Sequence, residues 1–227
     1  MKKERIYNTL SLVCNFAILL FTTFAVSNYF RMDVIHHSEW YNFIGFESLR
    51  FFTELSNISV AISGAIIIGF NIKNLICDDY KYPKWVLKMK YVNTVAVTLT
   101  MATVILFLAP GSALVGKGFF SFFSGGSFFT HLLNPLLAIF SFVFCERVEG
   151  FSFKNTFLGI IPTFLYGVVY FVMVVIVGEE NGGWPDFYNF TFGGHKWAMA
   201  VSIITMLSAT YFFALALWAW QKKLKKE

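Results

Sequence analysis

Thr53 and His131 are the residues of this chain whose types suggest nucleophilic chemistry. A threonine hydroxyl is a weak nucleophile that needs a neighbouring base to remove its proton, and imidazole suits that task near neutral pH. Each residue lies near the start of a long apolar segment, so both are expected at a shallow depth in a membrane. Structural roles compete with this interpretation. A threonine in a membrane helix can bond to its own backbone, and His131 could satisfy the carbonyl that Pro135 frees.

Other polar residues could support such a reaction. Glu54 could orient the imidazole, or it could simply extend to the outer membrane surface. Asn57 and Asn134 could donate hydrogen bonds to an oxyanion. Tyr166 and Tyr170 lie one helical turn apart and share a face. Asp186 follows in the run 184–188, whose aromatic residues suit a membrane interface.

The segments 51–57 and 128–134 resemble each other, with identical residues at five of seven positions. The match can be a parallel repeat of helical hairpins or an accident in a phenylalanine-rich chain. In both cases it predicts that Thr53 and His131 lie at nearly the same depth.

A metal site is a competing hypothesis. Four histidines are predicted at or near the outer face and, with Glu54 or Asp186, would supply enough ligands for zinc. Neither a His-x-x-x-His nor a His-Glu-x-x-His spacing is present, so the sequence evidence for a zinc site is weak. The four histidines are His36, His37, His131 and His195.

These residues must be positioned by helices that cross a membrane. The 227 residues are 57% hydrophobic and only 14% charged, with a mean hydropathy of +0.63. Such a composition excludes an ordinary cytosolic enzyme, a disordered tail and a disulfide-stapled secreted domain. Runs of roughly 20 apolar residues predict an all-α bundle, a single domain over 1–227. The expected spans are 8–30, 50–72, 88–109, 127–145, 156–178 and 196–220.

Basic residues set the expected orientation. Fourteen of the 18 lysines and arginines fall before the first span, in the second and fourth loops, or at the end of the chain. Only Arg31, Arg50, Lys117 and Lys196 fall on the other side, which predicts that both termini are cytoplasmic. Because the basic residues are spread over all the inner segments instead of lining one face, nucleic acid is not an expected partner.

The motifs resemble those of a known group. Phe51-Phe52-Thr53 followed by Ser56-Asn57, with His131 four residues before Pro135, resembles bacterial six-span membrane proteins. These look related to the androgen-induced and androgen-dependent (FAR-type) membrane proteins of animals. The pair Tyr166 and Tyr170 and the run 184–188 add to the likeness.

The resemblance implies a cofactor-free hydrolase of fatty-acid esters of hydroxy fatty acids in a bacterial plasma membrane. Thr53 would be the nucleophile and His131 the base. Glu54, Ser56 and Asn57 make the surroundings of Thr53 more polar than expected of the animal proteins, so the substrate can differ.

Two other functions stay open: a non-enzymatic binder or transporter of a small amphiphile, and a metal-dependent hydrolase. The inner halves of the spans are expected to offer no charged pathway, which argues against transport. Membrane lipids and a lipid-ester or amphiphilic substrate are the expected partners. The sequence leaves the oligomeric state open.

Overall fold

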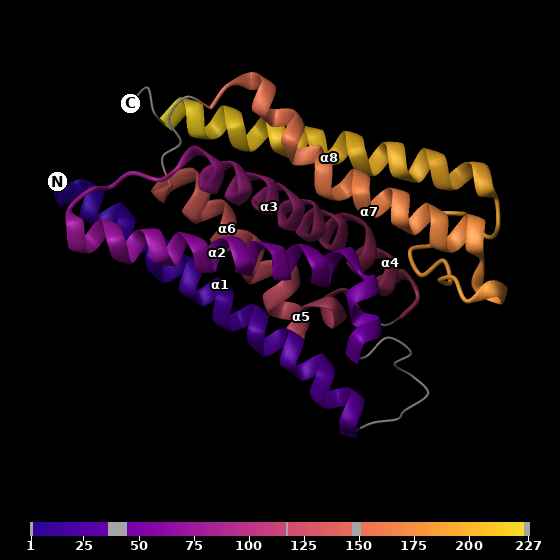
Figure 1. Ribbon diagram of the computed structural model, residues 1–227. Coiled ribbons are helices and arrows are strands. Elements are labelled where there is room, and N and C mark those ends of the chain that lie inside the picture. Colours follow the sequence, from indigo (N-terminus) through magenta and orange to yellow (C-terminus); the bar gives the residue numbers. More distant parts are fainter. Residues whose placement is uncertain (1, 36–44, 117, 147–150, 225–227) are drawn as a thin grey trace.

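The computed structural model describes residues 2–35, 45–116, 118–146 and 151–224. Within these ranges the chain is helical and has no strand, and six segments are long and apolar enough to cross a membrane. The predicted all-α bundle of six spans is therefore confirmed. Figure 1 shows these segments running alongside one another, with both termini at the same end.

Three spans are single long helices, the first, second and sixth, and the other three are built from pieces. The first two are α1 (Lys2–Ile35) and α2 (Phe52–Cys77). The third joins α3 (Lys84–Thr103), a π-helical segment (Val104–Leu108) and α4 (Ala109–Leu114). The sixth is α8 (Lys196–Leu224).

The fourth and fifth spans alternate between helix types. The fourth consists of α5 (Gly126–Phe128), a π-helical turn (Phe129–Leu133), α6 (Asn134–Phe140) and a second π-helical turn (Ser141–Cys145). The fifth consists of a 3-10 helix (Phe153–Ile160), α7 (Ile161–Phe171) and a π-helical turn (Val172–Val177). Shorter 3-10 helices cover Gly45–Arg50, Phe119–Phe123 and Glu179–Asn181.

The observed spans overlap all six predicted ranges, and each extends past its predicted range at one end or both. The second continues to Cys77 and the third begins at Lys84. Lys73 and Lys84, which the predicted spans left in the loop, therefore lie within helices. Lysine is a good helix former with a long apolar stem, so it does not end a helix at the membrane boundary.

The centre of the bundle consists of the third and fourth spans. In the most apolar stretch of each of these two spans, 50% of the residues are buried inside the protein. The corresponding share is 17% in the fifth span and 22% in the sixth, so these two spans expose most of their residues on the outside of the bundle. A compact apolar layer crosses the middle of the bundle. It is formed by Ile18, Val60, Ala61, Val97 and Ala138.

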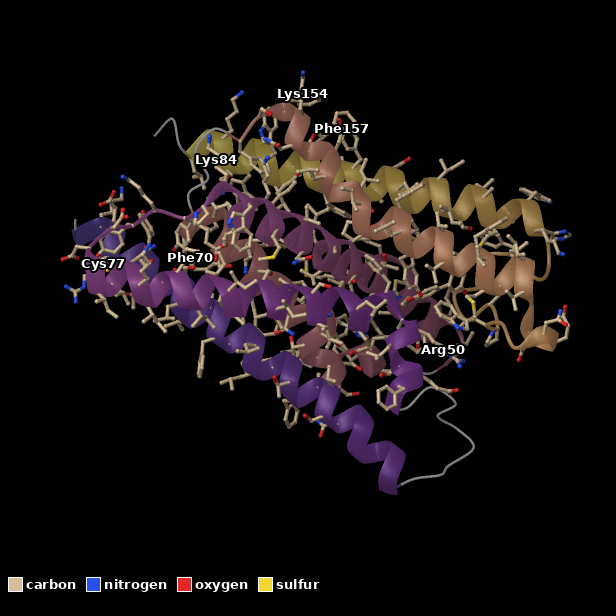
Figure 2. All side chains as sticks on the ribbon, in the orientation of Figure 1. Arg50, Phe70, Cys77, Lys84, Lys154 and Phe157 are labelled. Atoms are coloured by element: carbon tan, nitrogen blue, oxygen red, sulfur yellow. The ribbon has the colours of Figure 1, made fainter. Side chains whose placement is uncertain are left out.

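Buried polar residues lie on both sides of this layer. On α1, for example, Ser11 and Asn15 precede Ile18, and Thr22 follows it. Figure 2 shows Cys77, Lys84 and Lys154 at one end of the molecule and Arg50 toward the other. We refer to the lysine-rich end, predicted to be cytoplasmic, as the inner end, and to the end near Arg50 as the outer end.

Candidate active site at the outer end

Thr53 lies in the first turn of α2, where the chain is held by two tyrosines. The Tyr166 hydroxyl donates to the Arg50 carbonyl oxygen at 2.6 Å, and the Phe52 amide donates to the Tyr188 hydroxyl at 3.0 Å. The N-terminal amides of a helix lack partners within the helix. Tyr188 therefore supplies the acceptor that a capping side chain would otherwise provide, and it fixes the start of α2.

Thr53 borders a mainly apolar cavity of about 60 Å³. The walls come from α2, α3, α7, α8 and the outer segment around Tyr188. Thr103, Tyr166 and Tyr188 are polar members of this lining, and most other members are aliphatic or aromatic. Thr53 therefore lines an apolar, protein-walled space, the kind of surrounding in which proteins hold apolar small molecules.

His131 lies in the π-helical turn of the fourth span and is buried. Its Nδ1 lies 2.8 Å from the Phe122 carbonyl oxygen. A carbonyl can only accept a hydrogen bond, so Nδ1 carries the proton and donates it. In the neutral ring, Nε2 then has the lone pair, which is the form that a general base requires. The ring is bonded to Phe122 and not to the carbonyl that Pro135 frees.

The π-helical turn accommodates Pro135. The backbone N–H of Asn134 donates to the carbonyl oxygen of Phe129, five residues earlier, whereas in an α-helix it would donate to the carbonyl four residues earlier. Because proline cannot donate and its ring crowds the preceding turn, a wider turn here avoids a break in the helix. The local sequence thus places His131 on a distorted turn within a transmembrane helix.

Asn57 and Asn134 join the two similar segments directly. Asn134 Nδ2 donates to Asn57 Oδ1 at 3.0 Å and to Thr22 Oγ1 at 3.0 Å. Asn57 Nδ2 donates to the carbonyls of Thr53 and Thr130, at 2.9 and 3.0 Å. Both hydrogens of each amide are therefore in use. In this structure the two asparagines hold the helices together, and the oxyanion role that the sequence suggested for them stays a prediction.

Thr53 and His131 are therefore on adjacent segments but do not bond to each other. A single nitrogen, Asn57 Nδ2, lies within hydrogen-bond distance of the carbonyls of residues 53 and 130. Among the described residues, the Thr53 hydroxyl makes no hydrogen bond with His131, and His131 is not part of the cavity lining. The predicted common depth fits this arrangement, and the catalytic pairing stays a prediction.

Glu54 is 4% exposed, so it does not extend to the membrane surface as one interpretation of the sequence suggested. It lies in the first turn of α2, where a carboxylate is favoured by the helix dipole.

The outer segment 184–191 is organised around Asp186. Its Oδ1 accepts from the Tyr170 hydroxyl at 2.8 Å and the Phe190 amide at 2.9 Å. Its Oδ2 accepts from the amide and hydroxyl of Thr191, at 2.7 and 2.6 Å. Burial raises the pKa of Asp186, but the hydrogen bonds from Thr191, Tyr170 and Phe190 lower it by more, so its pKa lies below the usual range.

This segment folds back over the cavity. The Tyr170 ring packs near Phe187 and Tyr188, at centroid distances of 5.0 and 5.3 Å. Through the bond between Tyr188 and Phe52, the segment reaches the helix turn that carries Thr53. The aromatic run that sequence analysis assigned to the membrane interface therefore also builds the site, and Tyr188 is a site residue that the sequence did not single out.

The histidines do not assemble in the part of the chain that the structure describes. No group of three possible metal ligands occurs there. His195 is exposed next to Trp197, while His131 is buried in the fourth span. His36 and His37 lie outside the described residues.

A second polar site lies at the inner end, where the sequence led us to expect no charged pathway. Lys90 and Glu146 are both fully buried, with Lys90 Nζ 3.9 Å from Glu146 Oε1. Asn15 bridges them: it accepts from Lys90 Nζ at 2.6 Å and donates to Glu146 Oε1 at 2.7 Å. Ser11 also donates to Glu146 Oε1, at 3.0 Å. The inner end therefore contains buried charge that the sequence analysis did not locate.

The chain itself contained a signal for this site. Asn8, Ser11 and Asn15 recur on one face of α1, and Asn71 and Asn74 lie near the end of α2, which is a polar stripe that a membrane helix hides in its bundle. The stripe was not predicted as a site, because the inner lysines were interpreted only as evidence for the orientation in the membrane.

Comparison with known proteins found no match: no family model, no curated protein and no solved structure is similar to this chain.

Proposed function

We propose that the protein is an intramembrane hydrolase of lipid esters, in which Thr53 is the nucleophile and His131 the general base. The observation that carries the proposal is the position of Thr53 on the wall of an apolar cavity. Fatty-acid esters of hydroxy fatty acids are the substrate class that the sequence resemblance implies. Such a substrate would enter from the membrane between the weakly buried fifth and sixth spans.

Each step uses an atom of this chain. Thr53 Oγ1 attacks the ester carbonyl carbon, while His131 Nε2 accepts the hydroxyl proton. When the tetrahedral intermediate collapses, the C–O bond to the alcohol breaks, and His131 returns the proton to the departing alkoxide. Water activated by His131 then hydrolyses the acyl-Thr53 ester. A rotation of the Thr53 or His131 side chain is required to bring Oγ1 and Nε2 together.

Tyr188 is the proposed oxyanion donor, in place of Asn57 and Asn134. Its hydroxyl oxygen accepts from the Phe52 amide, and the hydroxyl also has a side-chain hydrogen bond with Tyr166. Because it borders the same cavity as Thr53, its hydrogen would turn toward the substrate when one is bound. Burial raises the pKa of Tyr188 to about 12, which keeps the phenol protonated at neutral pH. A fixed neutral donor in a dry site stabilises a developing oxyanion effectively.

The test is ester hydrolysis by the purified protein in lipid nanodiscs. Thr53→Ala and His131→Ala should each reduce the rate by roughly 10²-fold or more, because both remove a group that acts in the transition state. Thr103→Ala removes another hydroxyl from the same cavity, and His195→Ala removes an exposed imidazole, so both controls should keep the wild-type rate. Equal rates in all five proteins would refute the proposal.

The main alternative is a lipid-binding protein without turnover, which the lack of a bond between Thr53 and His131 favours. It predicts that a non-hydrolysable ether analogue binds and that the corresponding ester is recovered intact. The hydrolase proposal predicts that the ester is consumed.

A further inference from the structure

A second cavity lies at the inner end, separate from the candidate active site. It measures about 250 Å³, against about 60 Å³ for the outer cavity. Its walls come from the start of α1, the segment 80–82, the start of α3 and Cys145 at the end of the fourth span. The apolar layer around Ile18 and Val97 separates it from Thr53. A ligand in this cavity therefore could not contact the outer site.

The lining carries an excess of positive charge. Lys81 and Lys84 both border the cavity, and Glu4 is the one carboxylate among the lining residues. Neither lysine forms an ion pair within the part of the chain that the structure describes. Lys84 also begins α3, whose preceding residue, Pro83, provides no side-chain cap. The positive end of the α3 dipole thus adds to the two ammonium charges.

Hydroxyl and amide groups make up the rest of the polar lining. The Tyr82 hydroxyl lies within hydrogen-bond distance of Asn8 Oδ1 and Asn71 Oδ1 and can donate its one hydrogen to either. Asn71 in turn donates to Ser11, and Ser11 donates to Glu146. The floor of the cavity is therefore continuous with the buried network and is held in place by it, as expected for a preformed site.

We propose that this inner cavity binds the phosphate of a glycerol phosphate group, with Lys81 and Lys84 as the charged contacts. Lysine ammonium groups and helix N-termini are common phosphate partners. The second Nδ2 hydrogen of Asn8 and the hydroxyl oxygen of Tyr82, as an acceptor, would bond to the glycerol hydroxyls. The same chemistry is present in the headgroup of an inner-leaflet phospholipid and in soluble glycerol phosphate, and the proposal does not depend on the hydrolase activity.

General attraction of anions to a basic membrane surface makes a different prediction. Lys154 and Lys223 are exposed at the same end of the molecule but do not border the cavity. Figure 2 shows Lys154 and Lys84 projecting from different parts of that end. If only the surface potential mattered, removing either pair of charges would weaken binding equally.

The experiment measures the thermal unfolding midpoint of the detergent-purified full-length protein during titration with two probes. One probe is soluble glycerol 3-phosphate and the other is phosphatidylglycerol; glycerol and diacylglycerol are the matched probes without phosphate. A ligand that binds only the folded state raises the midpoint with increasing concentration. The proposal predicts such a rise with at least one phosphate probe and none with its unphosphorylated analogue. Which probe binds identifies the source of the phosphate.

The variants Lys81→Gln/Lys84→Gln and Lys154→Gln/Lys223→Gln locate the site, since both remove two exposed charges and keep most of the side-chain length. The first should weaken binding by roughly tenfold or more, because each charge-assisted hydrogen bond contributes substantially. The second should change the affinity by less than about twofold. An equal loss in both variants, a midpoint that neither phosphate probe raises, or an equal rise with unphosphorylated probes would overturn the proposal.

Discussion

Individual residues divide into those that border a cavity and those that hold helices together. Thr53 and Tyr188 border the outer cavity. Asn57 and Asn134 use all their side-chain amide hydrogens in hydrogen bonds within the protein. The sequence shows which residues carry polar groups, but not whether those groups bond within the protein or remain available to a substrate. Whether an asparagine has an N–H left for substrate depends on which carbonyls lie beside it, and this is set by the packing of three helices.

Tyr188→Phe tests the proposed oxyanion donor. The change keeps the ring and its aromatic packing but removes the hydroxyl, so the hydrolysis rate should fall by roughly 10²-fold while binding of an ether analogue is retained. The hydroxyl also accepts from the Phe52 amide, so circular dichroism should be recorded to confirm an unchanged helix content. A folded variant with the wild-type rate would assign Tyr188 to structure alone.

The buried pair of Lys90 and Glu146 should behave as a unit in a double-mutant cycle. Lys90→Met leaves the Glu146 carboxylate uncompensated in the bundle and should cost about 3–5 kcal/mol of folding free energy. Adding Glu146→Gln removes that charge, so most of the loss should be recovered. Reversible unfolding in mixed micelles measures both values. Additive losses in the double variant would show that the two charges do not interact.

At the scale of elements, the segment after the fifth span holds the start of α2. Asp186 accepts hydrogen bonds from Tyr170, Phe190 and Thr191, and Tyr188 continues the connection to Phe52. The sequence showed a turn rich in glycine and aromatic residues. It could not show that this turn folds inward, since the same composition suits a membrane interface.

Acid should loosen this segment. The pKa of Asp186 in the folded protein lies below the ordinary value of 3.8. The carboxylate therefore contributes stability above pH 3.8, and this contribution is lost as the pH falls through the lower, folded pKa. Amide hydrogen exchange at Phe190 and Thr191, corrected for the intrinsic effect of pH, should accelerate in that acidic range. In the variant Asp186→Asn, the amides of Phe190 and Thr191 should exchange rapidly at neutral pH as well. Continued protection of these amides in the variant would contradict the role of the Asp186 carboxylate in holding the segment.

Close packing between the fifth span and α8 depends on a glycine. A Cβ atom added at Gly159 would lie 2.9 Å from Ala214 Cβ, whereas one added at Gly69 on α2 would meet nothing within 4 Å. Gly159→Ala should therefore destabilise the protein by about 1–3 kcal/mol. Gly69→Ala should leave it unchanged or slightly more stable, because alanine is the better helix former. Thermal unfolding of the two variants compares them directly, and equal midpoints would argue against this helix contact.

At the scale of the whole molecule, six spans and their order were predictable because their apolar runs match the thickness of a bilayer. Their ends were less predictable, since the third span begins at Lys84 and not at residue 88. The inner polar network was missed because a lysine near a membrane boundary fits the positive-inside pattern whether it is exposed, like Lys73, or fully buried, like Lys90.

The predicted orientation can be tested with thiol labelling. Cys77 is exposed at the inner end, whereas Cys14 and Cys145 are buried. A membrane-impermeant maleimide should label Cys77 only after cells are permeabilised. In the variant Glu180→Cys, which places a thiol in the exposed outer turn, intact cells should be labelled. The opposite pattern would place the lysine-rich end outside and reverse the assignment of both cavities.

The most direct test of the central claim is a covalent adduct on Thr53. Nanodisc-embedded protein is treated with a lipid-tailed fluorophosphonate, and peptide mass spectrometry locates the modified residue. The proposed mechanism predicts an adduct on Thr53 that is absent from Thr53→Ala and slowed by roughly 10²-fold in His131→Ala, because the base is needed to activate the hydroxyl. An adduct on another residue, or modification of Thr53 at the same rate without His131, would contradict it.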